Sequence, residues 1–237
     1  MKVSVLINSY NQGEFIEEAI KSALNQNYPR DLYEIIVVDA LSTDGTDSVL
    51  NEYRDELKIV HQREKRGLAI GCNLGIKASS GEYIVRLDAD DLFLSNTLFI
   101  ESLFLDENED IDFVYPDYFI NRANATKRIK LPSFDPEEIF TRGDFLGGGT
   151  MYRRIVFDKF GYYDEGVKSI ENYELILRLL KNGAKGLHIT LPLYEYRYRD
   201  DSMSSDKKLM FEEGRKLEEK YGIRYQMGRW HPRNVSI

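Results

Sequence analysis

Apolar and polar positions alternate along the first half of the chain in two rhythms. Short runs rich in Val, Ile and Tyr, typical of buried strands, are followed by longer segments whose apolar residues recur every three to four positions, as on one face of a helix. Strands that alternate with such helices indicate a parallel sheet covered by helices. The pattern predicts strands at Val3–Ile7, Glu34–Asp39, Lys58–Gln62 and Tyr83–Leu87, and helices at Glu14–Leu24, Thr46–Arg54 and Leu68–Ala78. We therefore expect an α/β fold with a mostly parallel central sheet flanked by helices.

The regular alternation ends near residue 110, and shorter elements follow. The pattern predicts strands at Phe113–Tyr115, Tyr118–Asn121, Arg128–Leu131 and Leu187–Tyr196, a helix opened by Pro136, a helix at Ile170–Lys181, and a charged helix with a tail after Ser204. We expect residues 1–110 and 111–204 to be two halves of one domain, and residues 205–237 to be a C-terminal helix and tail.

Composition narrows the function classes. The chain has 237 residues and a net charge of -8, the wrong sign for neutralising nucleic-acid phosphates, so we expect no nucleic-acid partner. Its single cysteine, Cys72, can form neither an internal disulfide nor a four-cysteine zinc site. The sequence shows no apolar run long enough to span a bilayer and no secretory leader. We expect a cytoplasmic protein without a transmembrane segment, with peripheral membrane contact left open.

Three polar clusters each begin where a predicted strand ends. They are Asn8–Asn11, Asp39–Asp44 and Asp88–Asp91. The carboxyl ends of parallel strands lie at one edge of a sheet, and ligands bind at that edge in open α/β folds. We therefore expect the three clusters to line one site.

The acidic cluster carries the strongest chemical signal. Asp88, Asp90 and Asp91 place three carboxylates within four positions, and like charges this close repel each other unless a cation lies among them. Mg²⁺ and Mn²⁺ prefer carboxylate oxygens and commonly bridge one or two of them to substrate phosphates. The alternative is a solvated turn that caps the next helix, with Asp91 or Ser95 as its N-cap.

The other two clusters each admit two interpretations. Asp39 offers a carboxylate that could accept hydrogen bonds from a base or a ribose, or it could belong to a turn in which Asp44 and Thr46 cap the next helix. The segment Asn8–Asn11 offers hydroxyl, amide and ring groups that could hold a heterocycle, or it could form a capping turn.

A longer series of motifs contains these clusters. In the first 100 residues it comprises Val3–Gln12, Ser22–Gln26, Val37–Thr46, Arg66–Leu68 with Asn73, Gly81–Ile84 and Asp88–Asp91; later members are Phe160–Glu165, Glu171–Leu175 with Arg178, and Tyr196–Arg197 with Ser202–Ser204. In this order and spacing, the motifs resemble those of family 2 glycosyltransferases with the GT-A fold. The resemblance implies a Rossmann-like, mostly parallel sheet with a C-terminal acceptor-side lobe.

The resemblance also implies an activity: transfer of a sugar from a nucleotide diphosphate sugar to an acceptor hydroxyl, with inversion at the anomeric carbon. A UDP-sugar is the favoured donor, and the acceptor would be a saccharide or a lipid-linked molecule in cell-surface polysaccharide or glycolipid assembly. Residues 1–110 would bind the donor, and residues 111–204 would form the acceptor side.

Particular site residues follow from the same resemblance. Ser9, Tyr10, Asn11, Asp39 and Arg66 would hold the nucleotide, with Asp88 on its ribose and Asp90 holding Mg²⁺ or Mn²⁺ on the diphosphate. A divalent ion stabilises the departing diphosphate more in the transition state than in the ground state, which would give Asp90 a catalytic role.

One departure from the family pattern concerns the general base. The acidic pair of the later motif usually ends in Asp, the residue assigned as the base, whereas this chain has Glu171 followed by Asn172. An amide cannot take the proton from the acceptor hydroxyl. We therefore predict that Glu171 is the catalytic base, with Glu174, Asp164 and Glu165 as alternatives.

A second departure is Arg199, which stands where many relatives have His. A guanidinium cannot ligate a cation, but it can bind a diphosphate through two parallel hydrogen bonds. We therefore predict that Arg199 binds the diphosphate.

Two other functions remain open. A non-catalytic nucleotide-sugar-binding protein would have kept the nucleotide site and lost the general base, and an assay of transfer or hydrolysis with Mn²⁺ separates it from an enzyme. A nucleotidyltransferase that makes the activated sugar is disfavoured, because the usual Gly-rich loop after the first strand is replaced by Ser9–Gln12.

Overall fold

The computed structural model describes residues 1–64, 67–122, 125–142, 147–228 and 230–235. Within these residues, nine strands form one sheet in the order β3-β2-β1-β4-β8-β6-β9-β5, with β7 paired to β6. The strands are β1 (Val3–Ser9), β2 (Tyr33–Asp39), β3 (Lys58–His61), β4 (Tyr83–Asp88), β5 (Leu92–Phe93), β6 (Phe113–Arg122), β7 (Ala125–Ile129), β8 (Met151–Arg153) and β9 (Gly186–Arg197).

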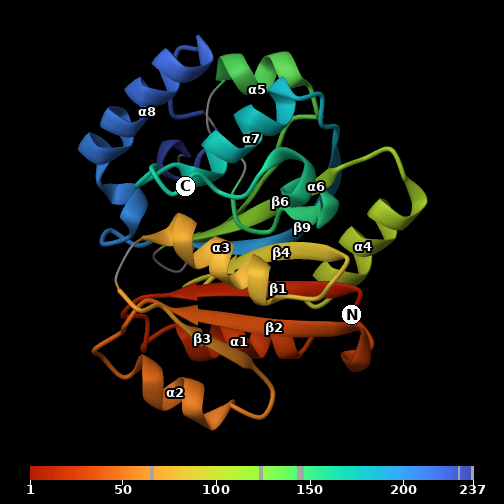
Figure 1. The fold of residues 1–237 in the computed structure, drawn as a ribbon, viewed down its shortest axis with the longest axis vertical. Helices are drawn as coiled ribbons and strands as arrows, with labels where there is room; N and C mark the ends of the chain where they lie inside the picture. Colours follow the sequence, from red (N-terminus) through yellow and green to blue (C-terminus); the bar gives the residue numbers. More distant parts are fainter. Residues whose placement is uncertain (65–66, 123–124, 143–146, 229, 236–237) are drawn as a thin grey trace.

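The first four strands form the parallel part of the sheet. β1 pairs in parallel with β2 and β4, and β2 pairs in parallel with β3. Helix α3 packs on β1 and β2, while α1 and α2 contact each other at the β3 end of the molecule (Figure 1). Their bounds are α1 (Ile16–Leu24), α2 (Thr46–Glu52) and α3 (Leu68–Ala78). The predicted α/β arrangement is confirmed here, with element ends shifted by at most two residues.

The second half is less regular. Its helices are α4 (Thr97–Glu107), α5 (Pro136–Arg142), α6 (Ile155–Phe160), α7 (Glu171–Lys181) and α8 (Lys207–Tyr221), with short 3₁₀ turns at Met203–Ser205 (η2) and Pro232–Asn234 (η3). A further 3₁₀ turn, η1 (Arg30–Leu32), precedes β2 in the first half. Helices α5, α7 and α8 gather at the end of the molecule opposite α2 (Figure 1). No helix in the described parts of the chain is both long enough and apolar enough to cross a membrane.

Two strand predictions for this half were wrong. Phe113–Tyr115 and Tyr118–Asn121 are parts of the single strand β6, because Pro116 and Asp117 lie at a register shift against β9 and do not end the strand. The strand expected at Arg128–Leu131 is β7, which begins at Ala125 and ends at Ile129.

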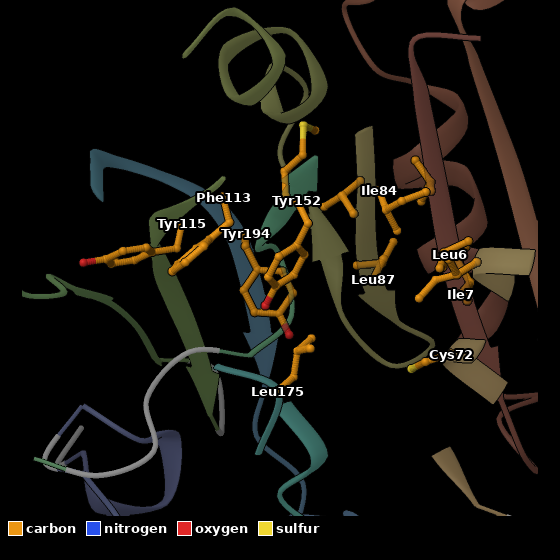
Figure 2. Close-up of a cluster of buried hydrophobic side chains, with 14 of the residues drawn as sticks. Leu6, Ile7, Cys72, Ile84, Leu87, Phe113, Tyr115, Tyr152, Leu175 and Tyr194 are labelled. Carbon is orange, nitrogen blue, oxygen red and sulfur yellow. The ribbon is translucent and has the colours of Figure 1, made fainter. Parts of the chain in front are cut away.

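The hydrophobic core continues across residue 110. In Figure 2, side chains of β1 and β4 such as Leu6 and Ile84 lie in the same cluster as Phe113 and Tyr152 from β6 and β8. The Tyr152 ring centroid is 5.7 Å from that of Phe113, a separation typical of packed aromatic pairs. One sheet and one core therefore connect the residues before and after position 110.

The order of the parallel strands creates a place for a ligand. β1 lies between β2 and β4, so the chain turns to opposite sides of β1 at this point, where open α/β sheets bind ligands. The strand register pairs Ser9 with Asp39 and Asn8 with Asp88. The three predicted polar clusters thus meet at one edge of the sheet.

Candidate active site

A cavity of about 640 Å³ lies at the carboxyl ends of β1 and β4. It is lined by the loop after β1, the acidic cluster after β4, the start of α7 and the segment after β9. The cavity brings together most of the predicted site residues, namely Ser9, Tyr10, Asn11, Asp88, Asp90, Glu171 and Arg199.

The other two predicted nucleotide-binding residues differ from this group. Asp39 ends β2, is 3% exposed, and is not one of the described residues that line the cavity. Its carboxylate accepts hydrogen bonds from the Ser42 N–H at 3.0 Å and the Ser42 hydroxyl at 2.5 Å. The direct contact of Asp39 is therefore with the loop that follows it. Arg66 lies outside the described residues.

Hydrogen bonds join the loop after β1 to the loop after β2. Asn11 has a φ of +52° and its N–H donates to the Ser42 hydroxyl at 2.8 Å, while its side-chain oxygen accepts from the Thr43 N–H at 2.8 Å. The Gly13 N–H donates to the Asp44 carboxylate at 2.9 Å. These bonds hold the loop after β1, which lines the cavity, against the loop after β2.

Two buried polar atoms of cavity-lining residues have no hydrogen-bond partner in the described part of the chain. The side-chain oxygen of Asn8 and the hydroxyl of Ser9 make no hydrogen bond to any described residue. Buried polar atoms without partners are rare and costly in folded proteins. A polar ligand bound in the cavity could satisfy both atoms.

The acidic cluster divides into two parts. Asp91 is 1% exposed and accepts hydrogen bonds from the Arg197 N–H at 2.8 Å and from the Tyr194 hydroxyl, so it fastens β9. The side chains of Asp88 and Asp90 are 28% and 19% exposed. Burial and the adjacent Asp88 carboxylate raise the pKa of Asp90. The alternative, a solvated turn that caps the next helix through Asp91 or Ser95, does not fit, because the N-cap of α4 is Asn96 and Asp91 is buried.

The Asp88 and Asp90 carboxylates fit a divalent cation in their chemistry. They are hard oxygen donors, and the charge of Asp88 disfavours ionisation of Asp90 unless a cation compensates it. Across the described ranges, no group of three or more His, Cys, Asp or Glu side chains is arranged to hold a metal. A cation at Asp90 would therefore need oxygens from a ligand, such as a diphosphate, to complete its coordination.

Glu171 is held in place by a buried arginine. It is the first residue of α7, is 4% exposed, and accepts a 2.9 Å hydrogen bond from the Arg86 guanidinium. The same guanidinium, on β4, lies 3.1 Å from a carboxylate oxygen of Asp88. Next to Glu171, the Asn172 side-chain oxygen accepts from the Tyr163 hydroxyl at 3.3 Å. Glu171 thus presents a carboxylate at the cavity, beside the amide that occupies the usual base position.

The three alternative bases lie elsewhere. Glu174 is fully buried and accepts hydrogen bonds from Lys220 at 2.9 Å and from the Tyr221 hydroxyl at 2.6 Å. Asp164 also pairs with Lys220, at 2.8 Å. Neither of these residues, nor Glu165, is among the described residues that line the cavity. Of the four candidate bases, Glu171 alone meets the geometric requirement of access to the cavity.

Arg199 crosses the cavity to the acidic cluster. Its guanidinium donates to Asp90 at 3.2 Å, to the Gln12 side-chain oxygen at 2.6 Å and to Asp201 at 2.8 and 3.0 Å. It also lies 4.1 Å from the centroid of the Phe15 ring, within the range of a cation–π contact. A guanidinium so placed can bind an anion that enters beside Asp90.

Two groups of residues around the cavity are not predicted from the sequence. Arg86 gave a signal, since it is a charged residue inside the apolar strand Tyr83–Leu87, but its partner Glu171 is 85 residues away. His231 and Pro232 also line the cavity, and nothing in the local pattern of the tail indicates that it returns to the site.

Comparison with known proteins assigns the chain to a class. The family model described as "Glycosyl transferase family 2" matches residues 4–161. The "Putative teichuronic acid biosynthesis glycosyltransferase TuaG" from Bacillus subtilis (strain 168) is 29% identical over 212 residues, covering 86% of this chain and 82% of that one. The Escherichia coli "UDP-Glc:alpha-D-GlcNAc-diphosphoundecaprenol beta-1,3-glucosyltransferase WfaP" is 28% identical, over 86% of this chain and 80% of that one.

Solved structures agree on the fold. S. aureus TarS in complex with UDP-GlcNAc has a TM-score of 0.76 at 21% identity, over 98% of this chain and 69% of that one. With UDP, the TarS match covers 90% of this chain and 65% of that one, just under two thirds of that chain, with a TM-score of 0.73. The mannosyltransferase PcManGT from Pyrobaculum calidifontis, in complex with GDP-Man and Mn²⁺, has a TM-score of 0.75 at 20% identity over 98% of this chain.

The family match, the similar structures and the geometry of the cavity point to the same class of protein. The fold is the α/β fold of GT-A glycosyltransferases, as the sequence predicts. This chain belongs to glycosyl transferase family 2, and it is a glycosyltransferase.

Proposed function

We propose that this protein is a metal-dependent, inverting glycosyltransferase that moves a sugar from a UDP-sugar to a hydroxyl of a saccharide or lipid-linked acceptor. The observation that carries the proposal is the cavity itself. The acidic pair Asp88 and Asp90, the Arg199 guanidinium and the Glu171 carboxylate all line it. Two polar atoms at its wall have no hydrogen-bond partner among the residues that the structure describes. The names of TuaG and WfaP support a role in cell-surface polysaccharide assembly.

Support for a UDP-sugar comes from relatives. WfaP is named for UDP-Glc, and TarS was crystallised with UDP and with UDP-GlcNAc. PcManGT was crystallised with GDP-Man, so the fold also accommodates a guanine nucleotide. A direct comparison of nucleotides is therefore the first test.

In this proposal, the sheet edge binds the nucleotide. Ser9 and Tyr10 form the wall of the base and ribose pocket, and Asn11 shapes that wall through its bonds to the second loop. Asp39 supports it through Ser42, Arg66 contributes as the family resemblance implies, and Asp88 binds the ribose.

The diphosphate lies between Asp90 and Arg199. A divalent ion held by Asp90 would neutralise charge on the departing diphosphate and so favour the transition state. Arg199 now pairs with Asp90, and a bound diphosphate offers the same guanidinium a more highly charged, bidentate partner. When the diphosphate binds, the Arg199 guanidinium therefore gives up its hydrogen bond to Asp90 in part and donates to the phosphate oxygens.

Glu171 takes the proton of the acceptor hydroxyl. Its carboxylate keeps one oxygen on Arg86, at 2.9 Å, so the side chain has a fixed orientation at the cavity. A base must come within about 2.6–3.2 Å of the hydroxyl that attacks the anomeric carbon. Attack from the face opposite the diphosphate gives inversion.

Calorimetry with UDP, dTDP and GDP, with and without Mn²⁺, tests the donor site. We expect the highest affinity for UDP, and a marked loss of UDP affinity in EDTA or in Asp90→Asn, because the diphosphate charge is then less compensated. Asp112→Asn, in the loop before β6, is not among the described cavity-lining residues and is the matched control for removing one negative charge. Preference for GDP, or UDP binding that EDTA leaves unchanged, would contradict the assignment.

The non-catalytic alternative has one specific observation in its favour. Asn172 occupies the usual base position, and Glu171 is already paired with Arg86. A protein of this kind would bind UDP with Mn²⁺ but release no sugar from any UDP-sugar in a hydrolysis assay.

A further inference from the structure

Arg199 lies in a short segment that follows the last strand of the sheet. It comprises residues 198–205, between the end of β9 and the start of α8, and we call it the Arg199 loop. Five of its members line the cavity: Arg199, Asp201, Ser202, Met203 and Ser204. The position of this loop decides whether the Arg199 guanidinium reaches Asp90.

One arginine near the end of the chain contacts this loop at five residues, and one of the contacts is an ion pair of 3.9 Å with Asp200. The side chain of Arg233, in η3, is only 4% exposed. Its guanidinium donates to the Arg199 carbonyl oxygen and the Ser202 hydroxyl, and its Nε donates to the Ser204 hydroxyl at 3.2 Å. Its central carbon lies 4.3 Å from the centroid of the Tyr198 ring.

The segment that presents Arg233 is itself anchored to the sheet. The Tyr118 hydroxyl, from β6, donates to the Trp230 carbonyl oxygen at 2.6 Å. The Arg233 N–H donates to Nδ1 of His231 at 3.2 Å, which closes the turn. A chain of contacts therefore runs from β6 through the C-terminal segment to the Arg199 loop.

We propose that Arg233 is a positioning residue for donor binding, which holds the Arg199 loop in the conformation that brings Arg199 to the diphosphate. The inference rests on the proposed role of Arg199. When a loop is already ordered before the ligand binds, less conformational entropy is lost on binding. Its hydrogen bonds to the ligand therefore contribute more fully to affinity. Arg233 suits this task because its planar fork holds several N–H donors in a fixed arrangement, which the flexible, rotatable ammonium of a lysine does not provide.

Isothermal titration of Arg233→Ala with UDP and Mn²⁺ gives the first test, and NMR titration with uridine gives the second. We expect UDP to bind about tenfold more weakly, the order expected when a loop must be fixed on binding, and uridine to bind within about twofold of wild type. Arg233→Lys should lie between the two proteins. Arg215→Ala, on the exposed face of α8, is the control and should match wild type.

The Arg199→Ala variant and the double variant R199A/R233A complete the test. If Arg233 acts through Arg199, its removal should weaken UDP binding much less in the R199A background. Should R199A weaken UDP binding while R233A does not, the inference is overturned and the role of Arg199 stands. Should R199A leave UDP binding unchanged, the proposed role of Arg199 itself fails.

Two further outcomes also decide the matter. Equal losses of uridine and UDP affinity in R233A would show a general structural defect and would overturn a role specific to the diphosphate. If R233A does not fold, R233K is used in its place. A lysine variant with wild-type affinity for UDP would then contradict the need for a planar fork.

Discussion

The guanidinium of Arg86 lies 2.9 Å from a carboxylate oxygen of Glu171 and joins β4 to the first turn of α7. The same group lies 3.1 Å from Asp88. One buried positive charge thus contacts both the residue proposed to bind the ribose and the residue proposed to be the base. This arrangement links the donor side of the cavity to the place where the acceptor is activated.

Replacing Glu171 with Gln should abolish most turnover without disturbing the donor. Gln keeps an oxygen that can accept from Arg86 but cannot take a proton, and general-base catalysis contributes about 10²–10⁴ in rate. We expect kcat to fall by that factor while the Kd for UDP with Mn²⁺ changes little. The control is Glu174→Gln, whose carboxylate bonds to Lys220 and Tyr221 away from the cavity, so kcat should be kept. Normal turnover by E171Q would show that the base lies elsewhere.

Replacing Arg86 with Met should destabilise the protein. The Glu171 carboxylate, 4% exposed, would be left buried without its partner, and breaking a buried pair costs about 3–5 kcal/mol. Adding Glu171→Gln in the same chain removes the unpaired charge. We therefore expect the double variant R86M/E171Q to be more stable than R86M in urea unfolding, and additive effects of the two changes would contradict the coupling.

Glu101, on α4, should make the protein less stable as pH rises. Its side chain is fully buried, neither carboxylate oxygen has a hydrogen-bond partner among the described residues, and burial raises its pKa well above the ordinary 4.5. The unfolded chain releases this proton above pH 4.5 while the folded state retains it, so stability falls as pH rises from there towards the folded-state pKa. Glu101→Met should therefore be about 1–3 kcal/mol more stable than wild type in urea unfolding at pH 8, and the gain should shrink at pH 5. An equal gain at both pH values would contradict this account.

His231 should make the protein less stable as pH falls. Burial and the Arg233 charge lower its pKa from 6.5 to about 4, and its Nδ1 accepts the Arg233 N–H. The unfolded chain takes up a proton below pH 6.5 and the folded state does not until about pH 4, so this residue costs stability as pH falls through that window. His231→Asn keeps an acceptor that does not titrate. The stability of wild type relative to H231N should fall by about 2 kcal/mol between pH 7 and pH 4.5, measured by thermal unfolding, and a constant difference would show that His231 does not titrate in this way.

The parallel half of the sheet could be predicted because its strands and helices have strong periodic patterns. A strand covered on both faces needs a continuous apolar run, as in Ile35–Val38, and its helices need one apolar face. In the second half, β5 and β8 span two and three residues, too few to show a period. Helix α4 has apolar residues on most sides, which hides its amphipathic period.

The site was partly predictable for a similar reason. The carboxyl ends of neighbouring parallel strands fix where Ser9, Asp88 and Asp90 meet, so sequence position alone indicated a shared edge. The partners of Arg86 and Arg233 depend on contacts across 85 and 34 residues, respectively, for which the local sequence carries no signal. Asp39 is the opposite case. It lies at the predicted edge of the sheet, but its carboxylate is hydrogen-bonded to Ser42 in its own loop.

We propose that the protein transfers a sugar from a UDP-sugar with inversion. In a hydrolysis assay, a water molecule takes the place of the acceptor hydroxyl. The measurement is ¹H NMR of the anomeric proton of the sugar that the purified protein releases from α-linked UDP-glucose and UDP-GlcNAc in Mn²⁺, recorded before mutarotation. We predict that the β-anomer forms first and that E171Q forms neither anomer at a comparable rate. Release of the α-anomer first, or no release from either donor by a protein that binds UDP, would contradict the account.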